Sequence, residues 1–149
     1  MLTADELARR SAEAMWNNDD ASKSIGISLE SVAPGTATVS MNVEPRHTNG
    51  HDICHGGFIF TLADTAFAFA CNSYNQVAVA QHNSITFVAP GKLGDKLTAV
   101  ASEVNRGKRS GIYDATVVNQ NNEIIALFRG NSRTLNATVI NDPLTQPDS

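Results

Sequence analysis

The sequence predicts an α+β fold in which a long antiparallel sheet wraps around one central buried helix. Residues 57–74 carry apolar side chains nearly all round a helical projection, which is the pattern of a buried helix. Two strand-like segments come before that helix and four come after it, with turn-forming residues between them. A β-sandwich is disfavoured because it offers no place for the helix.

The chain is expected to open with a helix that ends near Asn17. Thr3 followed by Glu6 matches a capping box, in which each side chain bonds the backbone of the other residue. A modest apolar stripe on this helix consists of Leu7, Ala8, Ala12, Met15 and Trp16.

A β-hairpin and a loop are predicted between the two helices. The hairpin arms cover about residues 25–32 and 36–43, and Pro34-Gly35 supplies the turn. Residues 46–57 show no clean periodicity and contain two glycine-rich points, so they are predicted to form a loop.

Four further strands are predicted after the buried helix. They cover about residues 77–88, 96–106, 111–119 and 124–135. Residues 105–110 and 119–122 consist of residue types that are common in hairpin turns, so a turn is predicted at each stretch. One domain over residues 1–140 is therefore expected, followed by a polar tail over residues 141–149 that we expect to fray.

The composition is that of an ordinary globular protein, with 42% hydrophobic residues, 17% charged residues and a formal net charge of -4. Such a mildly acidic chain lacks the basic footprint that nucleic acid or an anionic membrane surface requires. The N-terminal stretch MLTADELARR has no apolar core of signal-peptide length, so a cytoplasmic protein is expected. The longest unbroken run in the most apolar segment, residues 66–71, is too short to span a bilayer.

Neither the cysteines nor the histidines show the spacing of a metal site. Cys54 and Cys71 fit no metal or redox motif, and reduced thiols are expected. Three histidines recur at every fourth residue, namely His47, His51 and His55. On a helix they would share one face, but Gly50 and Gly56 interrupt such a helix, so a loop without a metal is favoured.

Asp64 stands near the middle of the most apolar segment of the chain. An ionised carboxylate is costly to remove from water without a partner, so this position needs an explanation. It is either a structural acid bonded to a neighbouring chain or to Thr65, or a catalytic base or nucleophile. The residues alone leave both explanations open.

Three segments of the chain resemble the hotdog-fold thioesterases of the phenylacetate-degradation (PaaI) type. They are NGHDICHGGFIFTLADTAFAFACNS, APGKLGDKLTA and GIYDATVVNQNNEIIALFRGNS, and the likeness extends over nearly the whole chain. The resemblance implies a hotdog fold, hydrolysis of acyl-CoA thioesters without metal or cofactor, and a homodimer or a homotetramer built from dimers. It also favours catalysis by Asp64, either as base or as nucleophile.

Gly56 and Gly57 precede the buried helix, where free backbone N–H groups and the helix dipole favour developing negative charge. They are candidates for polarising a thioester carbonyl, and a tight turn with positive φ is the alternative explanation. Gly56 and Asp64 are eight residues apart, or roughly 12 Å at the helical rise. One thioester carbon can hardly contact both, so Asp64 is expected to come from a second subunit.

Four polar residues are further candidates for the substrate site. Asn49 matches the family position whose side-chain amide helps to place the water, although Asn-Gly is also a common turn pair. His55 is expected to shape the loop by bonding backbone groups. Gln81 and Asn83 interrupt an apolar strand face, and they either line the acyl pocket or belong to an ordinary edge strand.

Arg106, Lys108, Arg109 and Arg133 are candidates for contacts with CoA phosphates, because cations near a cleft mouth suit that ligand. A solvated loop or strand end is the alternative for the short basic cluster of Arg106, Lys108 and Arg109. The expected substrate is phenylacetyl-CoA or a hydroxylated phenylacetyl-CoA. The alternative functions are a non-catalytic module that binds a CoA ligand and a hotdog enoyl-CoA hydratase, which would need a histidine beside the aspartate.

Overall fold

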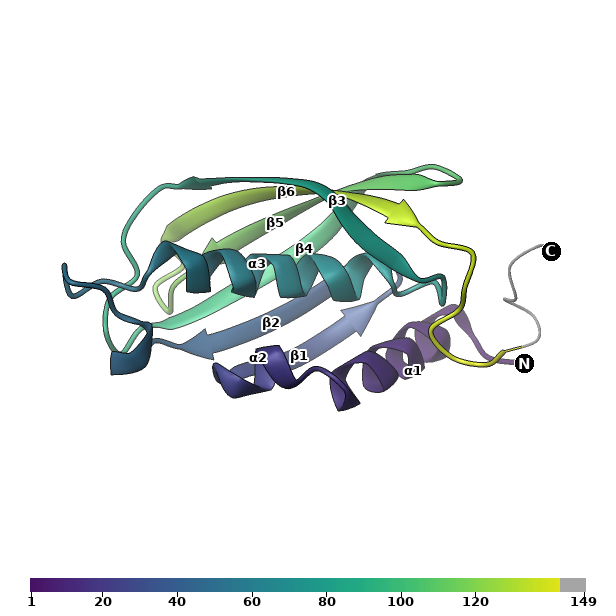
Figure 1. Cartoon of the computed structure of the whole chain (residues 1–149), viewed down its shortest axis with the longest axis horizontal. Coiled ribbons are helices and arrows are strands. Elements are labelled where there is room, and N and C mark those ends of the chain that lie inside the picture. Colours follow the sequence, from purple (N-terminus) through teal and green to yellow (C-terminus); the bar gives the residue numbers. More distant parts are fainter. Residues whose placement is uncertain (143–149) are drawn as a thin grey trace.

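The computed structural model describes residues 1–142, and these contain three α-helices, one short 3-10 helix and six β-strands (Figure 1). The helices are α1 (Ala4–Asn17), α2 (Asp20–Ser24), η1 (Pro45–His47) and α3 (Gly56–Cys71). The strands are β1 (Ile27–Ala33), β2 (Thr36–Asn42), β3 (Ala78–Phe87), β4 (Lys96–Arg106), β5 (Ser110–Val118) and β6 (Ile124–Thr134). Most of the predicted polar tail, residues 143–149, lies outside the described residues.

All six strands form one antiparallel sheet with the order β1-β2-β4-β5-β6-β3. The sheet curves around α3, which packs against β2, β4 and β5 (Figure 1). α1 and α2 pack against β1. The predicted α+β fold, a sheet wrapped around a central helix, is confirmed. Among the described residues, no helix combines the length and the apolar composition needed to cross a bilayer.

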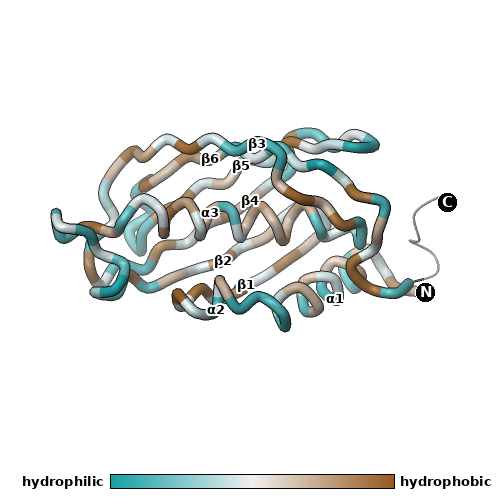
Figure 2. The backbone as a smooth tube through the Cα atoms, viewed as in Figure 1, coloured by the Kyte–Doolittle hydropathy of each residue, from teal (hydrophilic) through white to brown (hydrophobic). Residues whose placement is uncertain are grey.

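Small side chains on the inner face of the sheet let α3 approach closely. They are the fully buried Ala37, Ala99, Ala101, Ala115 and Ala126. From the helix, Leu62, Phe67 and Phe69 fill the remaining space and are also fully buried. Burial of one such large side chain stabilises the fold by about 1.5–3 kcal/mol. Figure 2 shows hydrophobic colours along the packed elements and hydrophilic colours in the loop before α3.

The elements differ from the sequence prediction in a few places. The sequence pattern does not predict α2, whose five residues are too few to show a period. Its cap is Asp19, which accepts a hydrogen bond from the Ser22 N–H at 3.0 Å. The loop before α3 contains the short helix η1. α3 ends about one turn earlier than expected, because the Asn72 side chain donates back to the Ala68 carbonyl at 2.8 Å.

β3 lies at one edge of the sheet and, within the described residues, pairs only with β6. Val79, Phe87 and the neighbouring Val88 are 46%, 51% and 54% exposed. An unpaired edge that also exposes apolar side chains is a surface on which a second chain can pair. The candidate site lies beside this edge.

Candidate active site

A buried histidine holds the loop that leads into α3. His47 has no exposed surface, its Nδ1 accepts from the Glu44 N–H at 2.9 Å, and its Nε2 lies 2.8 Å from the Ile25 carbonyl oxygen. The tautomer with the proton on Nε2 satisfies both bonds. The His47 carbonyl accepts from the His55 N–H at 2.7 Å, so both ends of the loop are fixed. The sequence pattern gave no sign of this role, because the Ile25 contact is long-range.

The N-terminus of α3 presents one free backbone donor. Nδ1 of His55 accepts from the Gly57 N–H at 2.9 Å and caps the helix, which is the loop-shaping contact expected of this histidine. The Gly56 N–H, by contrast, has no acceptor among the described residues. The positive end of the helix dipole increases its attraction for negative charge. Of the two glycines, Gly56 is therefore the one that can donate to a ligand.

Neither glycine has a positive φ, so the alternative explanation of a tight turn is wrong. Close packing explains them instead. A Cβ atom on Gly56 would lie 2.9 Å from Cζ of Phe87, and one on Gly57 would lie 3.0 Å from Nδ1 of His55. Only a residue without a side chain lets the Phe87 ring and the capping imidazole sit directly on the helix N-terminus.

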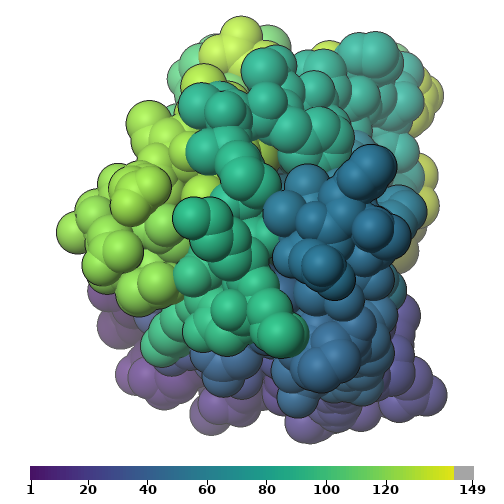
Figure 3. Space-filling view, turned by 90° about the vertical axis from the view of Figure 1, so that its left-hand side faces the viewer, coloured from purple at the N-terminus to yellow at the C-terminus, as the bar shows by residue number. Residues whose placement is uncertain are grey.

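Gly56 lines a cavity of about 450 Å³. Its other lining residues are Asn49, Ile53, Cys54, Ile59, Phe87, Val88, Ala89 and Pro90. Figure 3 shows the loop of residues 44–55 beside the segment of residues 88–95, and the Cys54 N–H donates to the Gly91 carbonyl at 2.7 Å between them. The Asn49 side-chain oxygen accepts from the His51 N–H at 2.9 Å, so this residue makes a local turn and also lines the cavity.

Both cysteines are buried and free, as expected for reduced thiols. Burial raises the pKa of Cys54 to about 11 and that of Cys71 to about 12. Because the thiolate is the reactive form, neither thiol is a nucleophile at neutral pH. Within residues 1–142 no three histidine, cysteine or acidic side chains are grouped so that they could hold a metal ion.

Asp64 bonds to the edge strand rather than to its neighbour on the helix. Its Oδ1 accepts from Nδ2 of Asn83 at 2.9 Å, whereas the Thr65 hydroxyl donates to the Thr61 carbonyl at 2.7 Å. Burial raises the pKa of the Asp64 carboxyl, and the Asn83 hydrogen bond offsets part of that rise. The amide oxygen of Asn83 is buried and has no partner among the described residues.

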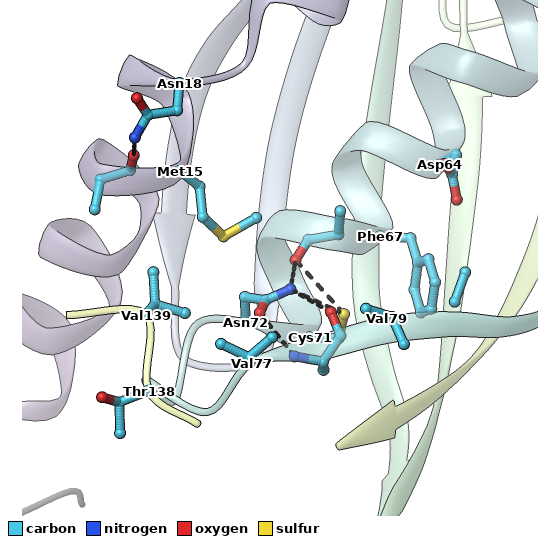
Figure 4. Close-up of a pocket in the computed structure, with 14 residues that line it drawn as sticks. Met15, Asn18, Asp64, Phe67, Cys71, Asn72, Val77, Val79, Thr138 and Val139 are labelled. Atoms are coloured by element: carbon cyan, nitrogen blue, oxygen red, sulfur yellow. Dashed lines mark hydrogen bonds between the residues drawn. The ribbon is translucent and has the colours of Figure 1, made fainter. Parts of the chain in front are cut away.

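Asp64 lines a second cavity, of about 550 Å³, which includes neither Gly56 nor Asn49 (Figure 4). Gly56 and Asp64 are eight positions apart on α3, a distance of roughly 12 Å. One chain therefore holds a hydrogen-bond donor in one cavity and a carboxylate in another.

A family model described as the thioesterase superfamily matches residues 51–126, which is more than half of the chain and includes Gly56, Asp64 and Asn83. The chain belongs to the thioesterase superfamily. The resemblance to the hotdog-fold thioesterases is thereby confirmed.

Two relatives in this superfamily are named as acyl-CoA thioesterases. The chain is 47% identical over 132 residues to acyl-coenzyme A thioesterase PaaI of Escherichia coli, covering 89% of this chain and 94% of that protein. It is 29% identical over 123 residues to human acyl-coenzyme A thioesterase 13, covering 80% of this chain and 88% of that protein.

Two solved structures share the fold. The structure of the E. coli PaaI protein from the phenylacetic acid degradation operon has a TM-score of 0.90 and 46% identity, covering 91% of this chain and 99% of that chain. A Streptococcus mutans protein bound to acetyl-CoA has a TM-score of 0.73 and 28% identity, covering 76% of this chain and 90% of that chain.

The remaining predicted substrate-binding residues lie away from the N-terminus of α3 in this thioesterase-superfamily chain. The basic residues lie at or beside the β4–β5 turn, and they are Arg106, Lys108, Arg109 and Arg133. This turn is at the opposite end of the sheet from the start of α3 (Figure 1). The Arg106 guanidinium stacks 3.7 Å from the ring centroid of Tyr74 and donates to Gln76 at 3.3 Å. Gln81 is exposed on β3 at an irregularity of the β3–β6 pairing.

Proposed function

We propose that the chain hydrolyses acyl-CoA thioesters, with Asp64 as the catalytic carboxylate and the Gly56 N–H as the donor to the thioester carbonyl. The Asp64–Asn83 pair carries the proposal, because it holds a partly buried carboxylate in the wall of a cavity. Two relatives are named acyl-CoA thioesterases and a third binds acetyl-CoA, which supports CoA thioesters as the substrate class.

The Gly56 N–H stabilises the negative charge that develops on the carbonyl oxygen as the carbonyl carbon becomes tetrahedral. As a general base, ionised Asp64 takes a proton from a water whose oxygen bonds to that carbon, and the C–S bond then breaks to release CoA. As a nucleophile, ionised Asp64 bonds to the carbon itself, and the C–S bond breaks to release CoA as the thiolate. Water then hydrolyses the resulting mixed anhydride, which releases the acid and regenerates the Asp64 carboxylate. Asn83 orients the carboxylate in both cases, and the amide of Asn49 places the water.

Two chains build each site under this proposal. Gly56 and Asp64 of one chain lie in separate cavities, roughly 12 Å apart. The exposed edge of β3 offers a pairing surface for a second copy. Pairing about a twofold axis sets the two β3 strands antiparallel and the two α3 helices side by side. Gly56 then faces Asp64 of the partner subunit across the interface.

The same arrangement brings the basic β4–β5 turn of one subunit toward the start of α3 in the other. β3 begins beside β6, where Val79 pairs with Arg133, and it ends at Phe87 against Gly56. When two β3 edges pair antiparallel, the start of each β3 lies beside the end of the other. The basic turn of one subunit then lies near the start of α3 in its partner. We assign the CoA phosphates to this basic turn, where Arg109 is exposed.

Phenylacetyl-CoA and hydroxylated phenylacetyl-CoA are the first substrates to assay, because a solved structure similar to this chain belongs to the phenylacetic acid degradation operon. Thiol release from a panel of acyl-CoAs measures turnover, and titration with CoA measures binding. We expect turnover of at least one acyl-CoA by the wild-type protein. Binding of CoA without turnover of any panel member would overturn the proposal and identify a ligand-binding module.

A further inference from the structure

The cavity beside Asp64 extends away from the carboxylate toward residues from both ends of the chain. Its walls come from α1, α3, the start of β3 and the segment after β6, which we name the C-terminal strap (residues 135–140). In Figure 4, Asp64 lies on one side of the cavity, and Met15 and Val139 lie on the other. The Met15 side chain points from α1 toward α3. Together these two residues form a far wall.

The interior of this cavity is mainly apolar, and besides Asp64 its polar side chains are Asn18, Asn72 and Thr138. The Asn72 side chain is saturated, since Nδ2 donates to the Ala68 and Ala78 carbonyls and Oδ1 accepts from the Ala78 N–H. The amide of Asn18 turns back to the Ala14 carbonyl at 3.2 Å. The apolar lining comes chiefly from Met15, Phe67, Val77, Val79 and Val139. A lining of this kind suits a hydrocarbon ligand.

Hydrogen bonds fix the far wall to the loop after α3. The Val77 N–H donates to the Ala137 carbonyl at 2.9 Å, and the Leu135 N–H donates to the Val77 carbonyl at 2.7 Å. The Asn75 side chain donates to the Ile140 carbonyl at 3.1 Å and accepts from the Ile140 N–H at 2.7 Å. The strap is thus a preformed wall that limits how far a ligand can extend.

We propose that this cavity takes the acyl chain of the substrate, and that Met15 and Val139 set the longest chain it admits. The assignment rests on the proposed function, because Asp64 marks the position of the reacting carbonyl. From Asp64 to Asn72, the residue that caps the end of α3, the cavity extends over eight positions of the chain, or roughly 12 Å. A phenylacetyl group is too short to fill that length, whereas an unbranched acyl chain of medium length, such as octanoyl, fits it.

Thiol release from acetyl-, phenylacetyl- and octanoyl-CoA by the full-length protein tests this assignment. We expect the wild-type kcat/KM to be higher for octanoyl-CoA than for acetyl-CoA. Met15→Trp shortens the cavity and should lower kcat/KM for octanoyl-CoA by about tenfold or more, with less than about a twofold change for acetyl-CoA. Val139→Trp shortens the cavity from the side of the strap, and it replaces Met15→Trp if that variant does not fold.

Glu13→Trp is the matched control. Glu13 is an exposed residue of α1 that lines a separate depression against β1, so kcat/KM should stay at the wild-type value for every substrate. An unchanged kcat/KM for octanoyl-CoA in folded Met15→Trp and Val139→Trp overturns the assignment, as does an equal loss for acetyl-CoA and octanoyl-CoA. Absence of thiol release from every acyl-CoA in the wild-type protein overturns the proposed function instead, so the two failures are distinguishable.

Discussion

The amide nitrogen of Asn83 lies 2.9 Å from a carboxylate oxygen of Asp64, and this bond joins the central helix to the edge strand of the sheet. The oxygen of the same amide has no partner within residues 1–142. A buried polar atom without a partner costs about 1–3 kcal/mol. A ligand, a water molecule or a second subunit can satisfy it, so the pair is open to one further polar partner.

Asp64→Asn should lower kcat by roughly 10²-fold or more, because the variant can neither accept a proton nor attack the carbonyl. Thiol release under saturating acyl-CoA is the measurement. Asp114→Asn is the control, since Asp114 is an exposed carboxylate paired with Arg129 and lines a different depression. Loss of activity in the control, or its retention in Asp64→Asn, would contradict the assignment.

The pH dependence of kcat/KM should show an acidic limb set by Asp64. Catalysis needs the ionised carboxylate, and burial raises its pKa above 3.8, so activity falls as the pH drops through that raised pKa. Asn83→Ala removes the hydrogen bond that lowers the pKa, so the limb should move to higher pH. Asn121→Ala, in the exposed β5–β6 turn, should leave the limb in place.

Asp64→Asn should also raise the Tm at neutral pH. A pKa that is higher in the folded than in the unfolded protein means that folding favours the protonated carboxyl. That stabilisation is present below the unfolded pKa and is lost as the pH rises through the folded pKa, so ionised Asp64 lowers stability at neutral pH. Calorimetry of the wild-type protein and of Asp64→Asn, near pH 7 and near pH 4, tests the sign of this effect. The Tm gained by the substitution should be smaller at the lower pH.

Gly56→Ala should reduce kcat by roughly 10²-fold, the typical loss when a donor to a developing oxyanion is displaced. The added methyl group would lie 2.9 Å from the Phe87 ring, which must move and disturb the cavity. Gly50→Ala is the control, because a Cβ there meets no atom within 4 Å. The double variant Gly56→Ala/Phe87→Leu should recover part of kcat. If it recovers none, contact with Phe87 is not the cause of the loss.

Mixing Asp64→Ala with Asn49→Ala should restore activity that neither variant shows alone. In a hybrid dimer one site combines intact Asn49 from one subunit with intact Asp64 from the other. Statistical subunit exchange would therefore return up to about a quarter of wild-type turnover. Sedimentation of the mixture confirms the dimer, and a fully active monomer would rule out a shared site.

Local signals made much of the fold predictable. The apolar pattern of residues 57–74 is enough for a buried helix, and Gly35, with a φ of 75°, supplies the expected hairpin turn. Strand order is not local. β3 pairs with β6, the last strand, rather than with the next strand along the chain, and periodicity in one sequence does not record such a pairing.

The residues of the candidate site were easier to single out in the sequence than the contacts they make. A carboxylate in an apolar helix and two glycines before it stand out in the sequence. Which glycine N–H is free depends on the His55 cap, and the Asp64–Asn83 bond depends on β3 lying beside α3. The stacking of Arg106 on Tyr74 likewise joins residues far apart in the sequence.

The far wall of the Asp64 cavity comes from Met15 and Val139, near the two ends of the chain, whereas the family model covers only residues 51–126. Under the two proposals above, the residues that limit acyl-chain length lie outside the stretch that holds the proposed catalytic groups, although Phe67, Val77 and Val79 of the same cavity lie inside it. If both proposals hold, mutations confined to the terminal stretches change which acyl chain is accepted while the proposed catalytic groups stay in place. A fold with this division can acquire new substrate preferences without first losing hydrolytic activity. Exchanging the terminal segments between related chains in the laboratory would use the same division.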